Sequence, residues 1–137
     1  MITKKYLNDL TYKIVGAAIV VHKALGPGLL ESVYHKCFKQ ELCLRELSHT
    51  SELIAPVHFK KIKLNTDLRC DFLIEDIIVV ELKSVDAIAP VHEAQILTYM
   101  KLLEKPKGIL INFCCFNLFK EGQRTFVNEY FRLLADE

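Results

Sequence analysis

The sequence of 137 residues lacks the features that mark membrane, secreted and repeat proteins. It has no apolar run near the roughly 20 residues that a membrane-spanning helix needs, and residues 1–6 are not followed by the apolar segment of a signal peptide. It also has no internal repeat, low-complexity tract or linker. We therefore expect a single domain, residues 1–137, with no membrane partner and enough length to bury a core.

An excess of either charge is missing as well. Eighteen Lys and Arg residues stand against 17 Asp and Glu residues, which gives a formal net charge of +1 at pH 7. A protein that attracts nucleic acid through its overall field carries a larger positive excess. Binding of a polyanion would therefore depend on a local basic group, for which the sequence offers Lys60, Lys61, Lys63 and Arg69.

The cysteines form no recognisable binding motif. There are five, at positions 37, 43, 70, 114 and 115; none shows C-x-x-C spacing and the last two are adjacent. This pattern suits neither a zinc knuckle nor a disulfide framework. We expect reduced cysteines that mostly pack in the interior of a cytoplasmic protein.

What the sequence does contain is a regular alternation of helical and extended segments. Apolar residues at spacings of three and four predict helices over 5–25, 29–47 and 91–103, with Gly26-Pro27-Gly28 ending the first. Short β-branched runs predict strands over 52–60, 67–75, 77–83, 108–113 and 124–128, with a polar connection from Lys61 to Thr66 and a short tail helix. The helix between 77–83 and 108–113 implies that these strands are parallel. The order predicts an α/β fold, an αβα sandwich around a central mixed sheet.

The strand over 77–83 ends unusually. Four β-branched residues, typical of a strand buried on both faces, run directly into Glu81-Leu82-Lys83. Glu81 and Lys83 point to the same face of a strand, where unpaired charge would be costly. With Asp71 on the preceding strand, they fit either a salt bridge at a strand end or a site for a divalent cation such as Mg²⁺, which prefers carboxylate oxygens.

The metal-site hypothesis makes a geometric demand on the connection between the two strands. A two-residue turn at Glu75-Asp76 would place Asp71 opposite Val80, with its side chain directed away from Glu81. The two carboxylates can share a face only if the connection has an odd length or carries a bulge.

Two helical patterns bring further polar side chains. Gln95 and Tyr99 are four residues apart, with His92 three residues before Gln95, so the three lie on one helix face. Glu31 and Tyr34 share a face of the second helix directly after the glycine-rich turn. Taken alone, each pattern is more typical of a structural role, as a core tyrosine with a satisfied hydroxyl or an acid placed at a helix start.

Several segments together resemble one family. Gly28-Leu29-Leu30-Glu31-Ser32-Val33-Tyr34 fits the signature GxxExxY. It is preceded by the segment 21–28 and followed by an R-x-D segment at 69–75, an E-L-K segment at 81–85, a Q-x-x-x-Y segment at 90–99 and an apolar strand at 108–113. In this order, and over nearly the whole chain, these motifs resemble the GxxExxY family, a branch of the PD-(D/E)XK nuclease superfamily. The resemblance implies a restriction-endonuclease-like core.

The resemblance also implies a function and a set of residues. It implies a divalent-metal-dependent nuclease that hydrolyses nucleic-acid phosphodiester bonds, with DNA as the expected substrate and Mg²⁺ or Mn²⁺ as cofactor. The implied catalytic residues are Asp71, Glu81, Lys83, Glu31 and Gln95, of which Asp71, Glu81 and Glu31 would hold the metal. The implied substrate-binding residues are Tyr99, Arg69, Tyr34 and His92. Tyr99 could instead support Lys83, and Arg69 could instead pair with Glu31.

Two other interpretations stay open at this point. The chain could keep the scaffold as a catalytically silent binding module or as a subunit of a larger complex, because fold does not establish function. It could also form a homo-oligomer through the apolar stripe of its first helix. The nuclease interpretation fails if Asp71 and Glu81 lie too far apart to share an ion, or if Lys83 points into the core.

Overall fold

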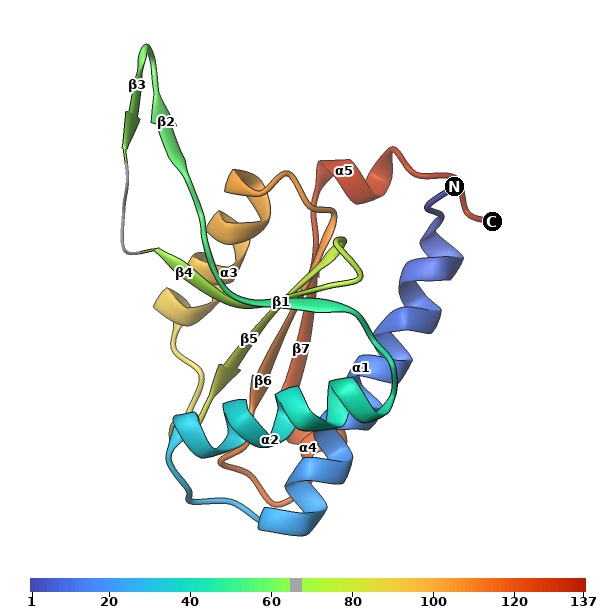
Figure 1. Cartoon of the computed structure of the whole chain (residues 1–137), viewed down its shortest axis with the longest axis vertical. Coiled ribbons are helices and arrows are strands. Elements are labelled where there is room, and N and C mark those ends of the chain that lie inside the picture. Colours follow the sequence, from blue (N-terminus) through green and yellow to red (C-terminus); the bar gives the residue numbers. More distant parts are fainter. Residues whose placement is uncertain (65–67) are drawn as a thin grey trace.

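The computed structural model describes residues 1–64 and 68–137 and places five strands in one mixed sheet (Figure 1). In spatial order the strands are β1 (His49–Ile54), β4 (Arg69–Ile74), β5 (Ile78–Lys83), β6 (Lys107–Asn112) and β7 (Gln123–Val127). Neighbouring strands are antiparallel except β5 and β6, which are parallel as their helical connection predicted. These two strands are buried along almost their whole length, which explains their continuous apolar sequence.

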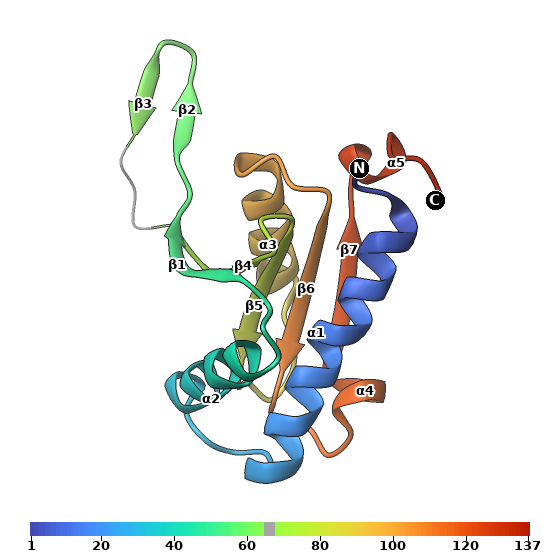
Figure 2. The same ribbon diagram turned by 45° about the vertical axis from the view of Figure 1, so that its right-hand side comes forward.

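Helices cover both faces of this sheet, which confirms the predicted αβα sandwich (Figure 2). The helices concerned are α1 (Lys4–Leu25), α2 (Glu31–Leu44) and α3 (Pro90–Leu102). α1 and α2 share a core with Phe72 and Val80 on one face, and α3 shares a second core with Val79 on the other. Because side chains alternate along a strand, Val79 and Val80 anchor β5 from opposite sides. The end of β5 is therefore held rigidly.

The first helix begins and ends where its sequence predicts. The hydroxyl of Thr3 accepts a hydrogen bond from the backbone N–H of Tyr6, as an N-cap residue does. At the other end Gly26 adopts a left-handed φ of 72° and its N–H donates to the carbonyl of His22. Over the described residues no helix, α1 included, is both long and apolar enough to cross a bilayer.

The region predicted as a strand over 52–60 differs from the prediction. β1 ends at Ile54, and after Ala55-Pro56 the chain forms a separate hairpin of β2 (Val57–Phe59) and β3 (Ile62–Leu64). Proline lacks the N–H that a continuous ladder would need, so the strand is interrupted there. β3 thus occupies part of the predicted polar connection, whose last residue, Thr66, lies outside the described residues.

The remaining differences are confined to the ends of elements and to one short helix. α2 is shorter than the predicted range 29–47, because the chain has already left the helix at Arg45. A four-residue helix that was not predicted, α4 (Leu118–Glu121), is capped by the side chain of Asn117. The predicted tail helix is α5 (Glu129–Arg132), and beyond it the C-terminus pairs with the start of α1, so the two termini lie together (Figure 1).

Candidate active site

Two carboxylates meet where β4 begins and β5 ends. The connection between these strands spans residues 75–77, an odd length, and the register pairs Phe72 with Val80. Beyond the last paired residues, hydrogen bonds between side chain and backbone join Asp71 to the end of β5. The connection therefore has the odd length that the metal-site hypothesis requires.

The two acids also replace the backbone ladder at this point. The N–H of Asp71 donates to Glu81 Oε1 at 2.8 Å, and the N–H of Leu82 donates to Asp71 Oδ2 at 2.8 Å. Each side chain thus accepts from the backbone of the opposite strand. One oxygen of each carboxylate is fixed by this exchange, which orients both groups before any ligand binds.

Burial makes this pair of acids electrostatically unusual. Glu81 is only 4% exposed, and burial, followed by the neighbouring charge of Asp71, raises its pKa to about 8. Burial also raises the pKa of Asp71, although the hydrogen bond from Leu82 opposes this. Two carboxylates in such a place hold a proton between them near neutral pH in the absence of a cation. The pair is therefore suited to accept positive charge.

Positive charge comes from Lys83, two residues after Glu81 on the same face of β5. Its side chain is half-buried, and its charge opposes the rise in pKa of both Asp71 and Glu81. It acts in the same way on Glu31, an exposed residue that begins α2 and whose pKa is raised chiefly by partial burial of its carboxyl group. Glu31, Asp71, Glu81 and Lys83 thus form one electrostatic group.

Helix α3 contributes a second layer behind the carboxylates. Tyr99 is 3% exposed, and burial followed by the charge of Glu81 raises its pKa. The side-chain amide of Gln95 donates to the Tyr99 hydroxyl at 3.2 Å. His92 lies one turn earlier and caps the helix, because its Nδ1 accepts from the N–H of Ala89 at 3.0 Å. Gln95 thus fixes the hydroxyl of Tyr99, whose ring lies on the α3 side of the sheet.

Tyr34 and Arg69, both predicted to bind substrate, have opposite environments. Tyr34 is fully buried and stacks on Phe113 at a centroid distance of 4.3 Å. Its hydroxyl donates to the carbonyl of Gly26 and accepts from the N–H of Leu29, so it holds the turn that leads into α2. The structure places Tyr34 in the core, away from any substrate. Arg69 is exposed at the start of β4, on the same strand face as Asp71.

A cavity of about 280 Å³ opens beside Asp71 and brings in four residues that were not predicted, among them His35 and Glu52. Its lining consists of Glu31, Ser32, His35, Lys36, Glu52 and Asp71. His35 stacks on Phe72 at 4.4 Å, and over the described residues its Nε2 is buried without a hydrogen-bond partner. The sequence could have indicated His35, because it lies four residues after Glu31 and so shares a helix face with it. The sequence could not have indicated Glu52, because it lines the cavity from a left-handed backbone conformation with φ of 54°.

The donor atoms of the site fit a hard divalent cation. Mg²⁺ is commonly bound by one or two carboxylates, with water and substrate phosphate completing its shell. Asp71 and Glu81 supply that pair, and burial raises the pKa of both even though the charge of Lys83 opposes the rise. Over residues 1–64 and 68–137, however, no three His, Cys, Asp or Glu side chains converge as a metal-binding group. The expected third ligand, Glu31, therefore does not join the pair in this arrangement.

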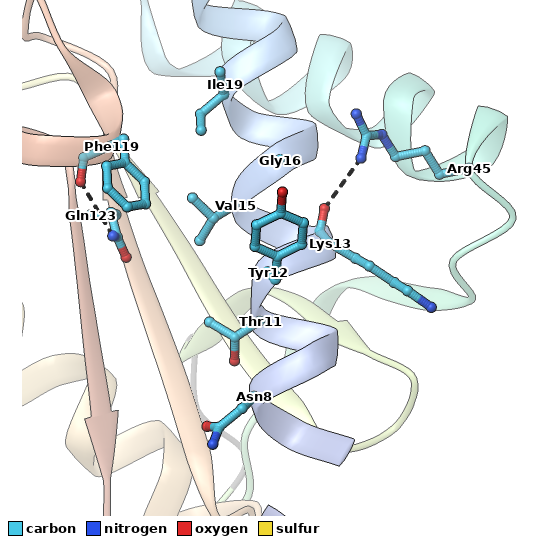
Figure 3. A pocket seen from close by; sticks show the side chains of 10 residues that line it. All are labelled: Asn8, Thr11, Tyr12, Lys13, Val15, Gly16, Ile19, Arg45, Phe119 and Gln123. Atoms are coloured by element: carbon cyan, nitrogen blue, oxygen red, sulfur yellow. Dashed lines mark hydrogen bonds between the residues drawn. The ribbon is translucent and has the colours of Figure 1, made fainter. Parts of the chain in front are cut away.

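A second cavity, of about 480 Å³, lies along the outer side of α1 (Figure 3). Its lining consists of Asn8, Thr11, Tyr12, Lys13, Val15, Gly16, Ile19, Arg45, Phe119 and Gln123. It contains no carboxylate and none of the predicted site residues, so it offers no pair of hard oxygen ligands. The carboxylates that could bind a cation lie instead on β4 and near the end of β5.

Comparison with known proteins gave one family match. A family model described as the PD-(D/E)XK nuclease superfamily matches residues 8–125, a range that includes every candidate site residue. Searches of curated proteins and of solved structures found no significant match. The mixed sheet flanked by helices is consistent with the restriction-endonuclease-like fold. Because the match covers well over half of its length, the chain belongs to the PD-(D/E)XK nuclease superfamily.

Proposed function

We propose that this protein is a divalent-metal-dependent nuclease of the GxxExxY branch that hydrolyses DNA phosphodiester bonds. The observation that carries the proposal is the buried pair of Asp71 and Glu81, whose carboxylates are oriented by each other's strands at 2.8 Å. A purely structural salt bridge would not require two adjacent acids of raised pKa. Superfamily membership supports a nuclease-type activity on nucleic acid.

In this proposal the two acids hold Mg²⁺ or Mn²⁺. When bound, such a cation supplies charge that polarises a phosphoryl oxygen and makes a nearby water more acidic. Asp71 and Glu81 each keep one oxygen on the backbone of the opposite strand, and in this proposal the other oxygen of each binds the cation. Glu31 approaches from α2 and accepts a hydrogen bond from water at the edge of the site.

The basic residues of the same face act on the phosphate. Lys83 is the catalytic lysine, which holds its ammonium group beside the reacting phosphate and stabilises the negative charge that develops there. Arg69, exposed two residues before Asp71, pairs with a neighbouring phosphate of the strand. Gln95 and Tyr99 are positioning residues that keep the end of β5 in place from the α3 side.

Cleavage assays with matched variants test the proposal. Purified protein is incubated with plasmid and with labelled oligonucleotides, with Mg²⁺, Mn²⁺ or EDTA present. We expect cleavage in either metal, none in EDTA, and a loss of roughly 100-fold or more in Asp71→Ala and Lys83→Ala. Lys101→Ala, which removes an exposed lysine from α3, serves as the control and should cleave normally.

Two outcomes would reject the proposal. Cleavage that persists in both Asp71→Ala and Lys83→Ala would come from a contaminant. A folded wild-type protein that cleaves no DNA and gains no thermal stability from Mg²⁺ or Mn²⁺ would be the silent binding module instead. The thermal shift separates these cases because it reports metal binding without turnover.

A further inference from the structure

The hairpin of β2 and β3 stands apart from the three layers of the fold. Figures 1 and 2 both show it projecting beyond the start of β4, away from α2. Its strands pair with each other in a separate two-stranded sheet. An isolated two-stranded ribbon gains little stability of its own, so a ribbon extended into solvent suggests a surface for a partner. We call residues 57–64 the arm.

The two faces of the arm differ in chemistry. The register pairs Val57 with Leu64, His58 with Lys63 and Phe59 with Ile62. Because cross-strand partners share a face, one face carries only Val57, Phe59, Ile62 and Leu64, and the other carries His58 and Lys63. Phe59 and Ile62, next to the turn, are 61% and 54% exposed. Apolar surface at the tip is thus open to a partner.

Positive charge is concentrated on the arm. Residues 57–64 contain three lysines and no acid, whereas the rest of the chain has 15 basic and 17 acidic residues. Removal of the arm would therefore change the formal net charge from +1 to −2. The body of the protein does not attract a polyanion through its net charge, whereas the arm does.

The turn of the arm holds two of these lysines at its tip. Lys60 and Lys61 connect the strands, and Lys60 adopts a left-handed φ of 54°, a conformation for which hairpin turns favour Gly or Asn. The Lys60 ammonium lies 5.4 Å from the centroid of the Phe59 ring. The tip therefore presents cations and an aromatic ring together, although a glycine would form the turn with less strain.

The arm is connected directly to the strands of the candidate site. β1 leads into it, and after it the chain returns to β4, which carries Arg69 and Asp71. β1 also contributes Glu52 to the cavity beside Asp71. A polyanion held along the arm would thus extend toward the carboxylates, with Arg69 between the arm and the site.

We propose that the arm binds double-stranded nucleic acid, with its lysines on phosphates and the Phe59–Ile62 end in a groove. A two-stranded ribbon fits the major groove of a duplex, and apolar side chains at such a tip can contact base edges or wedge between base steps. The proposal rests on the proposed function, since it assigns that site a duplex substrate. A protein partner on the apolar face would explain neither the three lysines nor the Lys60 turn.

The test compares two variants of the full chain with equal loss of charge. The arm variant is Lys60→Gln/Lys61→Gln/Lys63→Gln, and the control is Lys13→Gln/Lys23→Gln/Lys120→Gln, which changes exposed lysines of α1 and α4. Binding to labelled duplex and single-stranded oligonucleotides is measured in EDTA over a range of salt concentrations, so that no cleavage occurs. We expect the arm variant to lose roughly tenfold or more in duplex affinity and the salt slope to fall by about 2 to 3. The control should bind as the wild type does.

Four outcomes would overturn the proposal: equal duplex binding by wild type and arm variant, equal losses in both variants, preference for single strands, or no binding by the wild type. A fifth is a wild-type dimer that Phe59→Ser/Ile62→Ser dissociates while duplex binding is unchanged, since the apolar face would then bind a second copy.

Cleavage assays on the same proteins separate the two proposals. Arm-dependent binding without any cleavage would leave the arm assigned and reject the nuclease, whereas cleavage with arm-independent binding would do the reverse.

Discussion

Substitution of Glu81 by Gln tests whether the carboxylate pair is strained without a cation. Gln has nearly the same shape, and its carbonyl oxygen can still accept from the N–H of Asp71, as Glu81 does at 2.8 Å. Its amide nitrogen can donate to the Asp71 carboxylate, which in the wild type faces a second acid. The substitution therefore removes repulsion and buried charge without removing a side chain.

The sign of the effect follows from the pKa of Glu81, raised from 4.5 to about 8. Between these values the native state holds a proton that the unfolded state has lost, so the wild type becomes less stable as pH rises through this window. At about 1.4 kcal/mol per pKa unit, the upper bound is about 5 kcal/mol, shared with Asp71. We expect Glu81→Gln to be more stable than the wild type by roughly 2 kcal/mol or more at pH 9, and by little at pH 5.

Urea denaturation in EDTA at pH 5, 7 and 9 measures this difference, and Glu104→Gln, at an exposed position, controls for the loss of one acid. Mg²⁺ should stabilise the wild type at pH 8 and Glu81→Gln far less, because metal binding to the native state adds to stability. A variant that is less stable than the wild type at pH 9, or a difference that does not change with pH, would refute the reasoning.

Three further substitutions test the packing around the site, each by urea denaturation. Tyr34→Phe removes a fully buried hydroxyl that satisfies two backbone groups and should cost about 1–3 kcal/mol; an unchanged stability would contradict its role in the turn. Gly108→Ala places a Cβ within 2.7 Å of Met100 Sδ and should lower the free energy of unfolding by about 1–3 kcal/mol. The same substitution in a Met100→Leu background, where the side chain is less flexible, should show this loss even if Met100 moves aside in the single variant. His35→Phe keeps the stacking on Phe72 but removes a nitrogen without a described partner, so stability should rise by about 1 kcal/mol, whereas a loss would reveal a partner.

The layered fold could be predicted because its signals are local. The apolar spacing of α1 and the left-handed Gly26 define a helix and its end regardless of what surrounds them. The continuous apolar sequence of β5 and β6, with a helix between them, implied a parallel pair buried on both faces. Local rules could not foresee the arm, because whether a strand continues past Pro56 or leaves the sheet depends on the pairing partners available there.

The candidate site, like the fold, could be predicted from the sequence only in part. The sequence by itself determined that Asp71 lies within one strand and that Glu81 and Lys83 lie at the end of the next, because the strand pattern is a property of consecutive residues. Only the tertiary structure decided that Asp71 and Glu81 each accept a hydrogen bond from the backbone of the other's strand, because this contact depends on how the two strands pack. It also moved Tyr34 into the core and brought His35 and Glu52 beside Asp71. Burial and proximity arise only when separate elements pack together, and these set the charge state of the site.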